Sequence, residues 1–230
     1  MNFKIDDIDV EITRKKIKNM NLRVCSPVGN IKVSAPKKMS VDSIHRFILS
    51  NLPWIRRQQK KIRACPVVVR KEYKDGESHY FNGNIFLLKI VASQKSPQVV
   101  LIGSEIIIYV NADATRTKKQ LLLDKWYRDY LTEKTADLIA KWEKQMAVSV
   151  SRFSIRHMKT RWGSCSPKSR TIRINLALAK KSFACLEYVV VHELAHLLEA
   201  SHNKRFVSLM DQYLPAWRLC RDALNSEPPL

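Results

Sequence analysis

The sequence predicts an α+β fold, in which a β-rich N-terminal half precedes a helix-rich half that contains a small sheet. Three observations indicate this class. Short alternating apolar segments dominate residues 1–112, a long stretch with helical spacing follows, and two strand candidates and another apolar helix come after it. We expect the 230 residues to form a single domain, with residues 1–112 as its β-rich part and residues 113–230 as its core.

The N-terminal segment is predicted to form strands followed by helices. Apolar residues alternate over residues 9–35, which predicts short strands separated by a turn near residues 27–30. Ser40 is expected to cap a helix through Ile44 and Ile48, and Pro53 to begin a second helical segment.

The next segment predicts two hairpins and a long helix. Asn82-Gly83-Asn84 separates apolar runs and favours a tight turn, and Gly103-Ser104 does the same further on. Residues 115–146 repeat apolar side chains at helical spacing, which predicts an amphipathic helix of about 48 Å if it is unbroken.

Beyond it, strands are expected at residues 154–158 and 171–176, joined by a turn with the sequence GSCSPKS. A helix is expected over residues 183–199, and short helices over residues 206–224.

The chemistry concentrates in the sequence HELAH. His192 and His196 lie four residues apart, so on a helix they face the same side, about 40° apart, and can reach one metal ion. Glu193 is offset from both, which suits a carboxylate that hydrogen-bonds a metal-bound water. Histidines satisfied inside a core are the alternative, but so many polar groups on an otherwise apolar helix would be costly without a cation.

A catalytic zinc site usually has three protein ligands and one open position. His202 lies six residues beyond His196, after a segment that can turn, and is our predicted third ligand. Glu199 and Asp211 are the rival third ligands. Otherwise Glu199 or Glu187 is expected to hydrogen-bond a ligating imidazole.

The charge indicates anionic partners. The chain carries 41 Lys and Arg against 21 Asp and Glu, a formal net charge of +20, and residues 152–186 hold nine Lys or Arg with no acid. A solvated basic face is the plain interpretation, and an anionic substrate is the functional one.

The cysteine pattern favours a reducing compartment, since the five cysteines are odd in number and lack a C-x-x-C pair. The N-terminus lacks the apolar region of a secretory signal, and the apolar runs are too short to span a bilayer. We therefore expect a cytoplasmic protein without a membrane partner.

Three blocks resemble the YgjP-like metallopeptidase family of bacteria and archaea, which is related to the SprT and WLM groups. They are LPWIRRQQ near residue 55, MKTRWGSCSPKSRTIRINLAL at 158–178, and CLEYVVVHELAHLLEASHNKRF at 185–206 followed by LPAW. The resemblance implies a zincin-like core with His192, His196 and His202 as ligands and Glu193 as the catalytic acid/base. One departure is Val207, where the family pattern leads us to expect Trp.

The expected function is a zinc-dependent hydrolase, most readily a metallopeptidase, with one Zn²⁺ or another divalent metal per chain. The strand at residues 171–176 is expected to be an edge strand along the cleft that pairs with a peptide. Arg161, Arg173 and Asn175 are candidate substrate contacts. The alternatives are a nucleoside triphosphate pyrophosphohydrolase acting on an anionic nucleotide, and a nucleic-acid-associated protein with a structural zinc.

Overall fold

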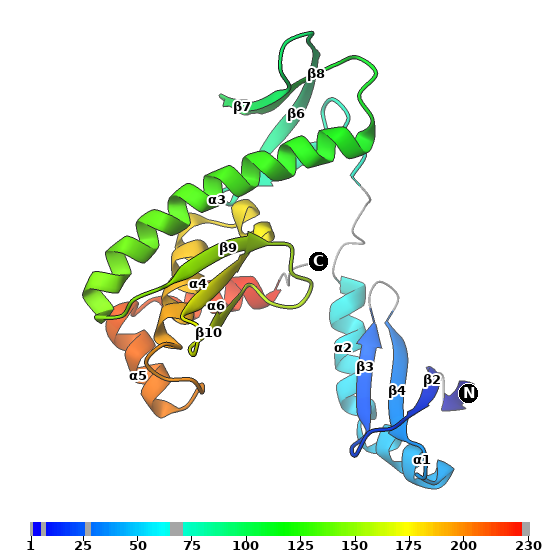
Figure 1. Cartoon of the computed structure of the whole chain (residues 1–230). Coiled ribbons are helices and arrows are strands. Elements are labelled where there is room, and N and C mark those ends of the chain that lie inside the picture. Colours follow the sequence, from blue (N-terminus) through cyan, green and yellow to red (C-terminus); the bar gives the residue numbers. More distant parts are fainter. Residues whose placement is uncertain (1, 6–7, 26–28, 65–70, 227–230) are drawn as a thin grey trace. The chain divides into compact units, whose positions relative to one another are not determined.

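The computed structural model describes residues 2–5, 8–25, 29–64 and 71–226 (Figure 1). The chain divides into two compact units, residues 1–70 and residues 71–230. The expected division after residue 112 falls inside the second unit, between a strand and the long helix. Cys65 lies outside the described residues.

The first unit is a small sheet with two helices. Its elements are β1 (Asn2–Ile5), β2 (Ile8–Lys15), β3 (Asn21–Cys25), β4 (Asn30–Pro36), α1 (Val41–Ser50) and α2 (Leu52–Ala64). The strand order is β1-β2-β4-β3, with β2 parallel to β4 and the other pairs antiparallel. Apolar residues alternate along β2 and β4, so one face of the sheet packs against the helices and the other carries polar side chains. Ser40 caps α1 as the sequence predicts, since its side chain accepts a hydrogen bond from the amide of Ser43.

The second unit begins with a four-stranded sheet. Its strands are β5 (Ser78–Phe81), β6 (Asn84–Ala92), β7 (Gln98–Ile102) and β8 (Glu105–Val110), in the order β5-β6-β8-β7. Both predicted hairpins form. Asn82 and Gly83 each have positive φ, 46° and 82°, which is the conformation of a tight two-residue turn between antiparallel strands. Gly103, with φ 56°, occupies the corresponding turn between β7 and β8.

The long helix α3 (Arg116–Met146) is unbroken. Thr115 caps its start by accepting a hydrogen bond from the amide of Lys118, and Ala147 ends it in a left-handed conformation. The helix packs against β7 and β8 at one part of its length and against β9 and α4 at another (Figure 1). One continuous core therefore joins the four-stranded sheet to the elements that follow, and residues 71–112 share it with residues 113–226.

The remaining elements form a second, smaller sheet and the C-terminal helices. They are β9 (Arg152–Arg156), β10 (Gly163–Ser166), β11 (Thr171–Asn175), the 3-10 helix η1 (Leu176–Lys180), α4 (Phe183–Ala195), α5 (Lys204–Tyr213) and α6 (Trp217–Ser226). The α+β class is as predicted, with the HELAH segment on α4. Among the described helices, none is both long and apolar enough to cross a bilayer.

Two local predictions about the smaller sheet are wrong. The segment expected to be a turn contributes β10, because GSCS pairs antiparallel with β11. The segment at 171–176, expected at an edge, supplies the central strand, because β11 also pairs in parallel with β9. The two edge strands are β10 and β9.

Candidate metal centre

Helix α4 brings the HELAH segment into the core. Its apolar residues are buried nearly all round, which fits a helix enclosed by α3, α5, α6 and β10. The helix ends at Ala195, four residues before the end that the sequence predicts, and His196 is its C-cap. The next residues continue as a turn, with the amides of Leu197 and Leu198 bonded to the carbonyls of Leu194 and Ala195.

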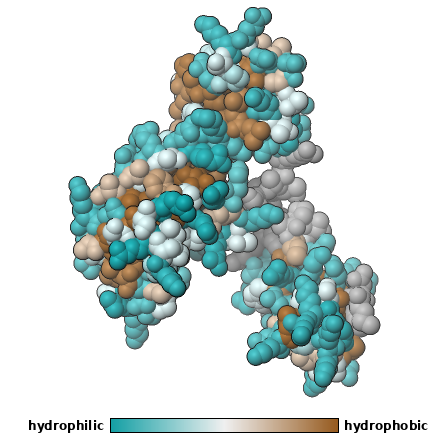
Figure 2. All heavy atoms as spheres, viewed as in Figure 1, coloured by the Kyte–Doolittle hydropathy of each residue, from teal (hydrophilic) through white to brown (hydrophobic). Residues whose placement is uncertain are grey.

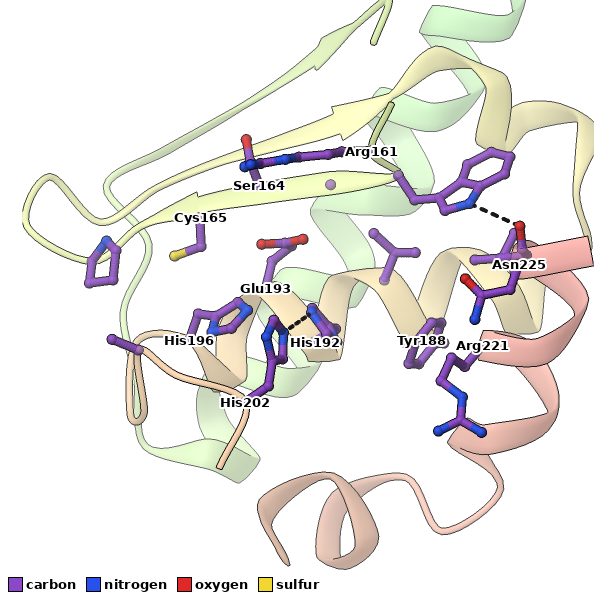
Figure 3. A pocket seen from close by; sticks show the side chains of 16 residues that line it. Arg161, Ser164, Cys165, Tyr188, His192, Glu193, His196, His202, Arg221 and Asn225 are labelled. Atoms are coloured by element: carbon purple, nitrogen blue, oxygen red, sulfur yellow. Dashed lines mark hydrogen bonds between the residues drawn. The ribbon is translucent and has the colours of Figure 1, made fainter. Parts of the chain in front are cut away.

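The three histidines converge. His192, His196 and His202 each offer a ring nitrogen, and these atoms lie within 4.8 Å of one another. The Nε2 atoms of His192 and His202 are 3.1 Å apart (Figure 3). Four ligands arranged tetrahedrally about zinc at 2.0–2.1 Å are separated by about 3.4 Å. The spacing of these nitrogens therefore suits a single metal ion.

A short polar turn returns the chain to the site. The Glu199 carboxylate accepts hydrogen bonds from the amide and hydroxyl of Ser201, at 3.2 and 3.0 Å. Asn203 then caps α5 by accepting from the amide of Phe206. These local bonds turn the chain after α4 and bring His202 back beside His192.

The three imidazole rings pack against Phe206, which was not predicted from the sequence. Phe206 is buried, and its ring centroid lies 4.7–4.9 Å from those of His192, His196 and His202. It fixes the imidazoles from the side of α5 by packing. The signal available in the sequence was its place at the end of the block 185–206, four residues after the third histidine.

The electrostatics favour neutral imidazoles. Burial lowers the pKa of His192 to about 3, and repulsion from His196 and His202 acts in the same direction. Burial likewise lowers the pKa of His196, while its hydrogen bond to Glu199 opposes the shift. Neutral imidazole is the form that binds metal ions. Within the described structure, Nδ1 of His192 is buried without a hydrogen-bond partner, and Nε2 faces His202. The three residues thus fit a divalent cation.

The orientation of His196 is set by the backbone. Its Nδ1 lies 3.1 Å from the carbonyl oxygen of Glu199, which leaves Nε2 free for a metal. Glu199 therefore supports a candidate ligand through its main chain, while its carboxylate bonds Ser201. Glu187 instead accepts hydrogen bonds from Lys141 and the indole of Trp142. Asp211 is held by Trp217 and Arg218.

Glu193 is buried beside the histidines. Its side chain is 5% exposed and lies against the backbone of Gly163 in β10. Burial raises the pKa of Glu193 to about 8, and the nearby Arg161 guanidinium opposes this shift. A carboxyl group with such a pKa can both accept and release a proton near neutral pH. Burial also raises the pKa of Cys165 to about 11, so its thiol is poorly suited to act as a nucleophile.

These groups line one pocket of about 560 Å³ (Figure 3). One wall comes from the edge strand β10 and the residues before it, another from α4, and a third from the end of α6. Its lining residues are Arg161, Trp162, Gly163, Ser164, Cys165, Pro167, Tyr188, Val189, His192, Glu193, His196, Ala200, His202, Arg221, Leu224 and Asn225. Trp162 closes one end by donating a hydrogen bond from Nε1 to the Leu224 carbonyl at 3.3 Å.

The three candidate substrate contacts have different positions. Arg161 lines the pocket. Asn175 is 1% exposed, and its amide donates to the carbonyls of Met158 and Arg161, so it holds the preceding loop in place. Arg173 is exposed on the central strand β11, and neither it nor Asn175 is among the residues that line the pocket.

A comparison with known proteins finds a matching family model and similar solved structures. The family model described as YgjP-like, metallopeptidase domain, matches residues 18–227. No curated protein matches. Among solved structures, the chain is similar to the zymogen of the metallopeptidase abylysin from Pyrococcus abyssi, at 21% identity, covering 41% of this chain and 94% of that chain with a TM-score of 0.38. It is also similar to the zymogen of jannalysin from Methanocaldococcus jannaschii, at 20% identity, covering 42% and 95% with a TM-score of 0.35.

The family match extends over most of the chain and includes residues 18–70 of the first unit and every residue of the pocket. It confirms the resemblance seen in the three sequence blocks. The chain belongs to the YgjP-like metallopeptidase domain family.

Proposed function

We propose that the protein is a zinc-dependent peptidase in which His192, His196 and His202 hold the metal and Glu193 is the general acid/base. The observation that carries the proposal is the convergence of three ring nitrogens within 4.8 Å, with a buried carboxyl group next to them in the sequence and in the same pocket. Zinc bound there would lower the pKa of a coordinated water and polarise the carbonyl under attack.

Glu193 has the properties required of a proton carrier. Its raised pKa lets the carboxylate take a proton from the attacking water and return it to the leaving amine. Its burial excludes bulk water, so its proton is exchanged with groups inside the pocket. This carboxyl group also argues against a purely structural zinc, because a structural site has closed coordination and no use for a proton acceptor.

The edge strand supports a peptide as the substrate. β10 pairs with β11 along one side only, and its residues Gly163, Ser164 and Cys165 line the pocket. An extended peptide could hydrogen-bond to the free edge by strand addition, which would place its backbone above Glu193. β10, rather than the central strand at residues 171–175, is therefore the expected peptide-binding edge.

The pocket charge favours a second candidate, the hydrolysis of a nucleoside triphosphate to release pyrophosphate. Arg161 and Arg221 line the pocket, and Glu193 is the one acidic residue among its lining residues. Cationic side chains together with a metal stabilise the charge that develops on a transferring phosphoryl group. The same two arginines would equally suit acidic side chains of a peptide.

The decisive experiment compares purified, metal-analysed protein on a denatured, unstructured polypeptide and on nucleoside triphosphates. We expect peptide-bond cleavage that Glu193→Gln abolishes while bound zinc is retained. Glu187→Gln is the matched control, because it is the same substitution on the same helix but its carboxylate bonds Lys141 and Trp142 outside the pocket. Pyrophosphate release without peptide cleavage would favour the second candidate. Turnover by Glu193→Gln at the parent rate would show that this residue is not the base.

A further inference from the structure

Positive charge is concentrated in the first unit, which contains none of the residues of the candidate metal centre. Residues 1–70 carry 16 Lys and Arg against five Asp and Glu, a net +11, whereas residues 71–230 carry 25 against 16, a net +9. The smaller unit therefore has nearly three times the charge per residue. On the face shown in Figure 2, hydrophilic side chains cover most of this unit. The zinc chemistry proposed above makes no use of this charge.

The sheet topology gathers five lysines at one end of the unit. β2 and β4 are parallel neighbours, with Lys15 in register with Pro36, so their last residues lie side by side. The chain leaves β2 as Lys-Lys-Ile-Lys and leaves β4 as Pro-Lys-Lys. We call this set the lysine end, and it consists of Lys15, Lys16, Lys18, Lys37 and Lys38. The sequence has no Asp or Glu from residue 12 to residue 41.

A half-buried arginine fixes the two lysine segments together. Nη1 of Arg14, at the end of β2, donates to the carbonyls of Met39 at 2.6 Å, Lys37 at 3.0 Å and Pro36 at 3.4 Å. In the turn after β4, the amide of Met39 donates a hydrogen bond to the carbonyl of Pro36. The backbone that carries Lys37 and Lys38 is thus held against β2, and the like charges are kept close despite their repulsion.

All five lysine side chains are exposed. None is in an ion pair with another residue of the described chain, in contrast to Lys32 on the same sheet, which pairs with Glu11 at 2.7 Å. A fixed group of exposed ammonium groups raises the local concentration of polyanions and suits closely spaced phosphates.

We propose that the lysine end binds the phosphodiester backbone of duplex nucleic acid, without sequence preference. Lysine ammonium groups act as point charges toward phosphates and do not read base edges as a planar guanidinium does. This interaction goes beyond the proposed peptidase activity and does not depend on it.

The surroundings of the lysine end favour a duplex over a single strand. Proteins that bind single strands stack bases on aromatic side chains. The described outward residues of β2, β3 and β4 include no aromatic side chain. They are Asp9, Glu11, Thr13, Lys15, Asn21, Arg23, Cys25, Asn30, Lys32, Ser34 and Pro36.

The surroundings of the lysine end also favour nucleic acid over an anionic membrane. Surface-bound proteins usually insert several bulky apolar or aromatic groups beside their basic residues. Between Lys15 and Lys38, Ile17 is the one large apolar side chain that is exposed among the described residues, and it is 36% exposed.

The test measures binding of the 230-residue chain to a fluorescent 20-base-pair DNA duplex by anisotropy, over a series of salt concentrations. The variant replaces the five lysines of the lysine end by glutamine. We expect at least about tenfold weaker binding, and a salt dependence whose slope falls by about 0.9 for each phosphate that the variant no longer neutralises. Replacing the same five residues by arginine should retain parent-like binding, since the charges remain.

The matched control removes five lysines from the second unit, Lys74, Lys95, Lys118, Lys119 and Lys144, and so changes the net charge equally. It should bind the duplex within about twofold of the parent, and circular dichroism should show that every variant is folded. The proposal is overturned if the parent does not bind the duplex or if the control loses as much affinity as the variant. Equal or tighter binding to a single strand or to phosphatidylserine vesicles would also overturn it.

Discussion

Gly163 in β10 lies directly against Glu193 in α4. A Cβ atom at residue 163 would come within 2.5 Å of Oε1 and 2.9 Å of Cγ of Glu193, and within 2.8 Å of Cγ1 of Val189. Real Cβ atoms do not approach other atoms so closely, so a side chain here would force the strand and the helix apart or displace the carboxylate.

Gly163→Ala is therefore expected to impair turnover without removing the metal. Displacing a reacting group by about 1 Å can lower the rate about 100-fold, so we expect a loss of kcat/KM of this order with zinc content unchanged. Peptidase assays with metal analysis of the same samples measure both. Gly103→Ala is the control, because nothing lies within 4 Å of its Cβ position, and its positive φ should reduce stability alone. Full activity in Gly163→Ala would show that Glu193 can move without consequence.

Asn175→Ala should destabilise the second unit. Its amide is buried and donates to the carbonyls of Met158 and Arg161 at 2.7 and 2.8 Å, and its oxygen accepts from the amide of Ala177. Leaving these groups unpaired should cost about 1–3 kcal/mol in the free energy of unfolding, measured by urea denaturation. Arg173→Ala, on the same strand but exposed, should change stability by less than about 0.5 kcal/mol. Similar stability losses in the two variants would contradict this assignment.

His202→Ala should lose most of its bound zinc. Even the hydrogen-bond partners of ligands change metal affinity by about 10–100-fold, so removing a ligand should exceed that range. Competition with a chromophoric chelator measures the affinity. His157→Ala is a suitable control, because His157 is largely exposed and contacts Asp124 at 3.3 Å rather than the other histidines. Unchanged zinc affinity in His202→Ala would indicate Glu199 or Asp211 as the third ligand.

His79 should make the second unit sensitive to mild acid. Burial lowers its pKa from the ordinary value of 6.5, although Glu77, 2.8 Å away, opposes the shift. Because the folded pKa lies below the unfolded one, the stabilising contribution is present above pH 6.5 and is lost as the pH falls through the folded value. Each such group changes the free energy of unfolding by up to about 1.4 kcal/mol per pH unit.

Urea denaturation between pH 7.5 and 5.0 tests this dependence. The free energy of unfolding of His79→Gln should fall less steeply with decreasing pH than that of the parent. Because both proteins contain the metal-centre histidines, the contribution of those histidines cancels when the two free energies are subtracted. Parallel curves for the two proteins would show that His79 titrates alike in the folded and unfolded states.

Local spacing explains which parts of the site were predictable from the sequence. A helix fixes the angle between residues four positions apart, so His192 and His196 had to share a face once α4 formed. The return of His202 also follows from nearby residues, because Ser201 and Asn203 form their turn-making bonds within a few positions. The class of fold was predictable for the same reason, since periodicity is a local property.

Pairing between distant segments explains what was not predictable. GSCS has a low intrinsic preference for strand, and it becomes β10 because β11 offers it a partner. The parallel pairing of β9 with β11 then places β11 in the centre, which buries Asn175 and leaves β10 as the edge strand that lines the pocket. Phe206 escaped attention because an apolar residue at a helix start reads as ordinary core unless the positions of the three rings are known.

The passage of α3 from the four-stranded sheet to α4 ties the candidate metal centre to strands that end more than eighty residues before His192. Leu123 and Tyr127 face one end of that shared interior, and Leu138 and Trp142 face the other. A fragment starting at residue 113 would expose the first pair to solvent and should fail to fold, even though it retains every histidine of the site. The protein would then lose its metal on heating in the same cooperative transition that melts the β5–β8 hairpins, rather than in an earlier local step.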